Sequence, residues 1–360
     1  MNIEKLSLEE KIGQIFLIQL EENEITDKTI NMIKKYKIGG IILYKRNYQN
    51  YKQMVELINK LKEINRENTI PLFISIDQEG GRVNRMPSEI LPIRNASKIA
   101  ATGDINIVKE SASIISKMLK ETGISINYAP VLDIKRFEEN HPIGDRCYGD
   151  NKDDVSKYGI EFMKQTMNEG IIPVVKHFPG HGTTKKDSHF RLPIVKEDKQ
   201  TIEKEDIVPF KKAIENGAEA IMIGHLEVKD MDSKYPASLS KKIIENYLIN
   251  TLNYKGLIIT DDLKMLAIQL RYTPEEASKL AINSGSNIIM LGLKYKRIQN
   301  VINYIIKEVK KGKIDISKID NSVEKIVKVK EKYNVNDNNI TGINIEEINK
   351  EIYNLNKKIN

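Results

Sequence analysis

The stretch "PVVKHF" at 173–178 decides how the rest of the chain is interpreted. It begins with apolar, β-branched residues, reaches the polar pair Lys176 and His177, and is followed by the break Pro179–Gly180. A short apolar run between turn signals is typical of a strand that is buried on both faces of a sheet. The segment therefore predicts a buried strand with polar side chains near its carboxyl end.

Seven further runs share this pattern of Ile- and Val-rich residues between turn signals. They are "IFLIQL" (15–20), "GGIILY" (39–44), "LFISID" (72–77), "SINYAP" (125–130), "AIMIGH" (220–225), "GLIIT" (256–260) and "NIIML" (287–291). Stretches with helical period lie between them. In one, Asp104 is placed to cap a helix that Gly123 ends, and one face of that helix carries Val108, Ala112, Ile115 and Leu119.

Eight strand–helix units predict an α/β fold, specifically a single-domain (β/α)₈ TIM-type barrel. The alternative is a doubly wound sheet, but no Gly-rich dinucleotide fingerprint follows the first strand. Polar residues at or just past the predicted strand ends favour the barrel, because a barrel gathers those ends on one rim. They are Asp77, Asp133, Lys176, His177, His225 and Asp261.

No linker divides the chain, so we expect a barrel over 1–333 and a polar tail over 334–360 that forms one helix. The single cysteine, Cys147, excludes an internal disulfide framework and indicates a reducing compartment. The first twenty residues lack the apolar core of a signal peptide, and no run is long enough for a membrane helix. These features predict a soluble, cytoplasmic protein.

The net charge of +7 raises the possibility of a nucleic-acid partner. The lysines, however, alternate with glutamates, as in "KEDKQTIEKED", which is typical of a solvated helix face. No zinc-finger, RNP-type or basic-zipper pattern is present. We therefore expect no nucleic-acid partner, no membrane and no cofactor. The sequence does not indicate an oligomeric state.

The segment "KHFPGHGTTKKDSH" (176–189) holds three of the five histidines. Its Pro and Gly residues argue against a helix, and in an extended segment Asp187 and His189 share a side. An aspartate that binds one ring nitrogen would leave the other free for general acid/base chemistry, although an inert solvated loop is the alternative. Metal binding by His181, Asp187 and His189 is a further alternative, but we expect no metal.

The segment "GLIITDDLKM" (256–265) places Asp261 and Asp262 directly after an apolar strand. Neighbouring strand residues face opposite ways, so one carboxylate at most should point into a site. Asp262 is the candidate N-cap of a helix that begins near Leu263. An aspartate nucleophile with a separate proton donor is the chemistry of retaining glycoside hydrolysis.

Two arginine-bearing segments complete the candidate rim. "ISIDQEGGRVNRM" (74–86) supplies Asp77, Arg82 and Arg85, and "GDRCYGD" (144–150) supplies Arg146 beside Cys147. Carboxylates that accept from hydroxyls, next to fork-shaped arginine donors, form a common grip on a sugar. A structural salt bridge after a turn explains the first segment equally well.

These motifs together resemble glycoside hydrolase family 3, in particular its single-domain β-N-acetylglucosaminidases. The similarity runs in order through "LSLEEKIGQIFLIQL", "GGIILYKRN", "IDQEGGRV", "NYAPVLDI", "KHFPGHGTTKKDSH", "IMIGH", "PASLS", "IITDDLKM" and "NSVEKIVKVKEKY". "KHFPGHG" followed by "DSH" is the most specific of these motifs. The resemblance covers nearly the whole chain.

The resemblance implies a role for each matching position. Asp261 corresponds to the nucleophile that forms a covalent glycosyl-enzyme, His189 to the acid/base and Asp187 to its orienting partner. The residues implied to hold the N-acetylglucosamine ring are Asp77, Arg85, Arg146, Lys176 and His177. Other family members take the acid from a second domain; we expect the histidine loop to replace it here.

The resemblance also implies cleavage of N-acetylglucosamine from cell-wall muropeptide fragments. Within the enzyme class, substrate-assisted hydrolysis, phosphorolysis and a broader activity on glucosides remain alternatives. Phosphorolysis is considered because lysines and arginines line the rim and a neutral histidine repels phosphate less than a carboxylate does. A sugar-binding protein without activity is the alternative outside that class.

Overall fold

The computed structural model describes residues 3–136, 143–182, 184 and 192–359. Eight parallel strands form its centre, in the order β10-β1-β2-β3-β4-β5-β7-β9, and each lies within one of the eight predicted runs or extends it by one residue. Their bounds are β1 Phe16–Gln19, β2 Gly40–Leu43, β3 Phe73–Ile76, β4 Ile126–Asn127, β5 Ile172–Phe178, β7 Ala220–Ile223, β9 Leu257–Thr260 and β10 Ile289–Leu291.

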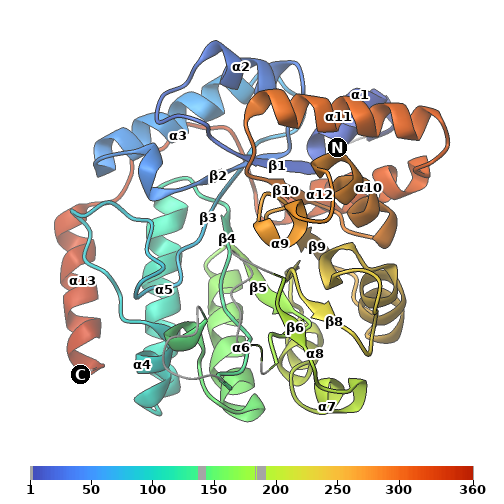
Figure 1. Cartoon of the computed structure of the whole chain (residues 1–360). Coiled ribbons are helices and arrows are strands. Elements are labelled where there is room, and N and C mark those ends of the chain that lie inside the picture. Colours follow the sequence, from blue (N-terminus) through green and yellow to red (C-terminus); the bar gives the residue numbers. More distant parts are fainter. Residues whose placement is uncertain (1–2, 137–142, 183, 185–191, 360) are drawn as a thin grey trace.

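The two outer strands of this order meet, which closes the sheet into a barrel. A parallel bridge joins Ile259 to Ile288, and the backbone N–H of Thr260 donates to the carbonyl of Ile288 at 3.0 Å. The strands run in the middle of the molecule and the helices surround them (Figure 1). The predicted (β/α)₈ barrel is therefore confirmed, and the doubly wound alternative is wrong because its edge strands would stay unpaired.

The helices follow the strands around the barrel. Their bounds are α1 Leu8–Gln14, α2 Asp27–Lys34, α3 Tyr51–Asn65, α4 Ala96–Ala101, α5 Ile105–Glu121, α6 Lys152–Asn168, α7 Lys199–Lys204, α8 Val208–Glu215, α9 Leu266–Gln269, α10 Pro274–Ser284, α11 Tyr295–Lys310, α12 Ile316–Lys332 and α13 Ile345–Lys358. A π-helix covers Lys242–Thr251, and single 3₁₀ turns cover Ile3–Lys5, Lys45–Asn47, Gly144–Arg146 and Ala237–Leu239.

Helix α5 shows how the sequence encodes these elements. The carboxylate of Asp104 accepts the N–H of Asn106 at 2.8 Å, as expected of an N-cap. The predicted apolar face is fully buried, and Gly123 takes a positive φ of 77° just after the helix. A residue with a β-carbon would be strained in that conformation, so glycine suits the end of the helix.

One feature outside the barrel, a second sheet, was not predicted. A small parallel sheet pairs β6, Ile194–Val195, with β8, Glu227–Val228. Strands of two residues are too short for any periodicity to reveal them.

The tail helix α13 buries Ile348, Ile352 and Leu355 and lies along the outer side of α5 (Figure 1).

In the described part of the chain, none of the helices combines the length and the apolar character that crossing a bilayer would require.

The amino end of the barrel is closed by Lys330 of α12. Its side chain is buried, and its ammonium donates to Oε1 of Gln14 at 3.1 Å and to the carbonyls of Gly39 at 3.0 Å and Pro71 at 2.7 Å. The ammonium also lies 4.3 Å from the ring centre of Phe73. One lysine thereby links three segments that lead into neighbouring strands.

We expect Lys330→Met to lower the free energy of unfolding by about 2–5 kcal/mol, because three buried acceptors lose their donor. Urea unfolding of the variant and the wild type measures the difference. Lys328→Met is the matched control, since Lys328 lies on the same helix with a side chain that is 69% exposed. Equal unfolding midpoints for wild type and Lys330→Met would contradict this account of Lys330.

Candidate active site

A cavity of about 540 Å³ opens at the carboxyl end of the strands. The six predicted site residues that lie in the described part of the chain all line it: Asp77, Arg85, Arg146, Lys176, His177 and Asp261. They lie in β5 and in the segments that follow β3, β4 and β9, and are as much as 184 positions apart in sequence. The barrel therefore brings these side chains to one place, and their chemical roles stay predictions.

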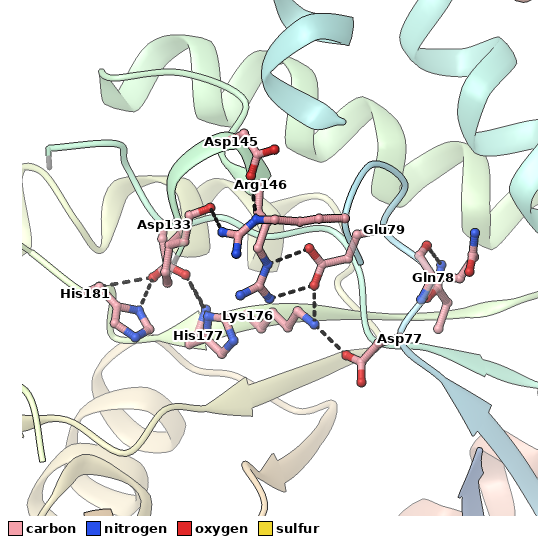
Figure 2. A network of polar contacts seen from close by, with 12 residues as sticks. Asp77, Gln78, Glu79, Asp133, Asp145, Arg146, Lys176, His177 and His181 are labelled. Atoms are coloured by element: carbon pink, nitrogen blue, oxygen red, sulfur yellow. Dashed lines mark hydrogen bonds and ion pairs between the residues drawn. The ribbon is translucent and has the colours of Figure 1, made fainter. Parts of the chain in front are cut away.

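Two cations and two carboxylates form a buried network along one wall of this cavity (Figure 2). The ammonium of Lys176 lies 2.8 Å from Oδ1 of Asp77 and 2.7 Å from Oε1 of Glu79. The guanidinium of Arg146 donates to both oxygens of Glu79, each at 2.7 Å. A bidentate contact of this kind fixes the plane of the guanidinium as well as its distance from the carboxylate.

Glu79 is a residue that the sequence reasoning missed. Burial by itself would raise the pKa of its carboxyl group, but the charges of Arg146 and Lys176 outweigh burial and lower the pKa to about 2. Glu79 therefore stays ionised between two cations. The available signal was its place in "DQEGG", where a second acid follows the strand end before a glycine turn.

The two arginines of the segment 74–86 take different places. Nε of Arg82 donates to Oδ1 of Asp145 at 2.7 Å in a half-exposed ion pair, which matches the salt-bridge interpretation. Nε of Arg85 is buried and has no hydrogen-bond partner among the described residues. A buried donor that faces a cavity without a partner favours binding of a polar ligand there.

Asp133 connects two histidines of the "KHFPGH" segment. Its Oδ2 lies 2.7 Å from Nδ1 of His177 and its Oδ1 lies 3.0 Å from Nδ1 of His181 (Figure 2). The carboxylate accepts, so each ring donates through Nδ1. Burial lowers the pKa of His177 more than Asp133 raises it, which favours the neutral ring with Nε2 left for a ligand.

The same three residues, Asp133, His177 and His181, carry ligand atoms within 4.8 Å of one another and could hold a metal ion. In the structure these atoms are joined by hydrogen bonds, which already use the Nδ1 atoms and both carboxylate oxygens. The arrangement orients the imidazole rings without a metal. This combination differs from the His181, Asp187 and His189 set that the sequence suggested.

The adjacent carboxylates after β9 have different surroundings. Asp261 is partly exposed in the cavity, whereas Asp262 is buried and accepts the backbone N–H groups of Lys264 at 3.0 Å and Gly292 at 2.7 Å. Burial raises the pKa of Asp262 although these two hydrogen bonds oppose the effect. The prediction that Asp262 caps a helix near Leu263 is wrong, because α9 begins at Leu266 and Asp262 instead stabilises a turn.

His225 does not face the cavity, although it follows a strand end. Its ring is buried between the hydroxyl of Ser238, 2.7 Å from Nδ1, and the carbonyl of Asp262, 3.0 Å from Nε2. Both ring nitrogens are thus occupied. The residue supports the turn that carries the two aspartates.

Positive charge also borders the mouth of the cavity. The guanidinium of Arg46 lies 4.5 Å and the ammonium of Lys264 lies 5.9 Å from the ring centre of Tyr44, which lines the cavity. Both cations donate to Oε1 of Gln19, at 2.7 Å and 3.0 Å. Sequence reasoning did not identify this pair, because its members come from different strand–helix units.

The predicted acid/base His189 and its partner Asp187 lie outside the described residues. The described residues on either side are Gly182 and Thr184 before them and Leu192 after them. The roles of His189 and Asp187 therefore stay predictions from the sequence.

Comparison with known proteins finds relatives of this chain. Beta-hexosaminidase A of Pseudoalteromonas piscicida is 32% identical over 326 residues, which are 84% of this chain and 54% of that protein. The chain therefore spans about half the length of that relative. A beta-hexosaminidase of Haemophilus influenzae is 32% identical over 280 residues, which are 76% of this chain and 78% of that protein.

The structural comparison gives the same result. The solved structure of a glycoside hydrolase family 3 β-N-acetylglucosaminidase from Paenibacillus sp. str. FPU-7 superposes with a TM-score of 0.91 at 32% identity. The match covers 98% of this chain and 69% of that one. The family described as "Glycosyl hydrolase family 3 N terminal domain" matches residues 7–329. The chain therefore belongs to glycoside hydrolase family 3.

Proposed function

We propose that the chain is a retaining exo-β-N-acetylglucosaminidase that removes terminal N-acetylglucosamine from cell-wall muropeptide fragments in the cytoplasm. One observation carries the proposal: Asp261 lines the same cavity as all five residues that the family resemblance assigns to the sugar. Relatives named beta-hexosaminidase and β-N-acetylglucosaminidase support the choice of sugar.

Asp261 is the proposed nucleophile because it is the more accessible member of its pair. Its carboxylate attacks the anomeric carbon while protonated His189 gives its proton to the leaving oxygen, so the glycosidic bond breaks and a glycosyl ester forms. Neutral His189 then takes a proton from water, which attacks the same carbon and releases Asp261. The buried Asp262, held by two backbone N–H groups, supports the turn without taking part.

The remaining wall residues are proposed to hold the sugar. Asp77 is about 20% exposed at its side chain and accepts from Lys176, so its other oxygen is available to a hydroxyl. Arg85 contributes its unpaired Nε, and His177 contributes the ring nitrogen that does not contact Asp133. The Glu79 carboxylate acts indirectly, because it fixes Lys176 and Arg146 at this wall.

Two cations, Arg46 and Lys264, support a substrate whose leaving sugar carries a negatively charged group. Lys264 lines the cavity together with Asp261, and Arg46 lies close to it because both cations contact the ring of Tyr44 and the side chain of Gln19. The carboxylate of a muramic acid would meet favourable charge there. This arrangement favours muropeptide fragments over neutral glucosides.

The activity itself is tested with aryl N-acetylglucosaminide, glucoside and galactoside substrates, in the presence and absence of phosphate. We expect N-acetylglucosamine as the product from the first substrate alone. Sugar 1-phosphate as the main product would replace the hydrolase proposal with phosphorolysis. Equal rates on the glucoside would replace the proposed sugar specificity.

We expect Asp261→Ala to lower turnover of the aryl N-acetylglucosaminide by about 10⁴-fold or more, because the covalent route is lost. An unchanged thermal midpoint would show that the variant folds. In the wild type, a fluorosugar should label the peptide that contains Asp261, as read by mass spectrometry. Near-normal turnover of Asp261→Ala, or labelling at another residue, would refute the assignment.

The loss of activity in His189→Ala should depend on how strongly the leaving group of the substrate needs a proton. A poor leaving group needs the proton, so we expect a loss of about 10²–10⁴-fold, and a much smaller loss for an activated aryl group. The measurement is kcat/KM for a series of aryl substrates of graded leaving-group acidity, because kcat/KM reports formation of the glycosyl-enzyme, whereas kcat also depends on the second step, in which His189 is the base. A loss of the same size across the whole series would argue against proton donation by His189.

Glu79→Gln should raise KM and lower stability, because Lys176 and Arg146 lose their shared counter-ion. The folded pKa of Glu79, about 2, lies below the unfolded value of about 4.3, so its contribution is present above pH 4.3 and disappears as the pH falls through 2. Over the full shift it amounts to about 3 kcal/mol.

Urea unfolding of wild type and Glu79→Gln at pH 7 and pH 3 measures this difference, which should shrink at the lower pH. Glu56→Gln is the control, since Glu56 is an exposed acid on α3. A stability difference that is the same at both pH values would rule out the proposed ionisation of Glu79.

A further inference from the structure

A second cavity, of about 550 Å³, lies at the amino end of the barrel, opposite the candidate active site. Its lining includes Leu72, Ser125 and Ile171, which come just before β3, β4 and β5. The ends of α3, α5 and α6 and the segment 333–340 after α12 complete the wall. The size falls within the usual range for small-molecule sites.

The charged side chains that line this cavity are all cationic. They are Lys62, Lys120 and Lys332, and none of the described residues in the lining is an aspartate or glutamate. Lys332 is paired with Glu219, and the ammonium of Lys120 donates to the carbonyl of Glu169 at 3.0 Å. The cavity therefore presents positive charge that its own lining does not neutralise.

Lys62 is the residue that distinguishes this cavity from an ordinary surface depression. It is 6% exposed, yet within the described residues its ammonium has neither a hydrogen-bond acceptor nor a carboxylate at ion-pair distance. Burial lowers the pKa of Lys62, and the charge of Asp337 opposes this effect. The oxygens of Asp337 are used by the N–H of Leu72 and the amide of Asn65.

Comparison with Lys330 shows why this is unusual. Both lysines are buried at the same end of the barrel, but the ammonium of Lys330 has three acceptors within 3.1 Å. A structural lysine is satisfied in this way, because a buried polar group without partners costs free energy. Among the described residues the ammonium of Lys62 has no such acceptors, and its tip is accessible in the cavity that it lines.

One glycine leaves room for the ammonium of Lys62. A β-carbon on Gly123 would lie 3.1 Å from that ammonium, which is a tight contact. Gly123 also has a positive φ of 77°, where other residues are strained. The ammonium of Lys62 can therefore approach the backbone at the start of a strand.

The outer wall is fixed before any ligand arrives. The side chain of Asn59 donates to the carbonyl of Ile340 at 2.9 Å and accepts its N–H at 2.8 Å. Nε of Arg66 donates to the carbonyl of Asp337 at 3.0 Å. A preformed wall lowers the entropic cost of binding.

We propose that this cavity binds a small organic anion, a phosphate monoester or a carboxylate with an apolar part. The anionic group of the ligand pairs with Lys62 and supplies the counter-charge that Lys62 lacks among the described residues. Lys120 makes a second favourable contact with the same group. The apolar part packs against Leu72, Ile124, Ile171 and Ile340. The site is independent of the proposed glycosidase activity.

The test is calorimetric titration at low ionic strength with three probes: phenyl phosphate, benzoate and inorganic phosphate. All proteins carry Arg85→Met, which weakens anion binding in the active-site cavity. We expect Lys62→Met in this background to weaken binding by about ten- to hundredfold, the value of a charge-assisted hydrogen bond. Tighter binding of phenyl phosphate than of benzoate identifies a phosphate ligand, and the reverse order a carboxylate.

Lys52→Met is the matched control, because Lys52 is an exposed lysine of the same helix, α3. It should leave the affinity unchanged. Thermal unfolding gives a second readout: Lys62→Met should keep or raise the midpoint, since the apolar stem stays buried and no protein hydrogen bond of the ammonium is lost among the described residues. Lys120→Met serves as a second variant, for which we expect a smaller loss of affinity.

Absence of binding by any probe, or equal affinities for Lys62→Met and its parent, would overturn the proposal. So would a loss of stability in Lys62→Met as large as that of Lys330→Met, since it would show that Lys62 already has a structural role.

Discussion

The candidate active site depends on the ion pairs that the buried carboxylate of Glu79 makes with two cations. It balances Arg146, which comes from the loop after β4, and Lys176, which comes from β5. Neither cation could remain buried at this wall without a counter-charge, because desolvation of an unpaired charge is expensive. Asp77 then completes the set from the end of β3, so that one pairing scheme joins three consecutive units of the barrel.

The charged side chains at the two ends of the barrel have different kinds of partners. At the carboxyl end, carboxylates and cations are interleaved, and Asp133 holds two imidazoles by their Nδ1 atoms. At the amino end, Lys330 is satisfied by neutral acceptors, whereas the ammonium of Lys62 faces a cavity and has no partner among the residues that the structure describes. Within the described residues, a cation that faces a cavity therefore also occurs at the end of the barrel opposite the candidate active site.

The strands and the fold were predictable because their signal is local. Each strand is a contiguous apolar run between turn residues. In α5 the apolar residues recur with the helical period between Asp104 and Gly123. The residues at strand ends followed from the topology of a barrel. The position of Asp262 was misjudged, because its partner Gly292 is 30 residues away and no local pattern reports that contact. Glu79 was missed for the same reason, since its two cations lie 67 and 97 positions further along.

The sequence by itself determined the order of strands and helices, the fold class and the family, since these depend on periodicity and on contiguous motifs. The tertiary structure decided which polar side chains are paired and which are left facing a cavity. It separated Asp261 from Asp262, Arg85 from Arg82, and Lys62 from Lys330, although each pair looks alike in the chain. The physical reason is that burial and charge balance depend on neighbours distant in sequence, and these neighbours meet when the barrel closes.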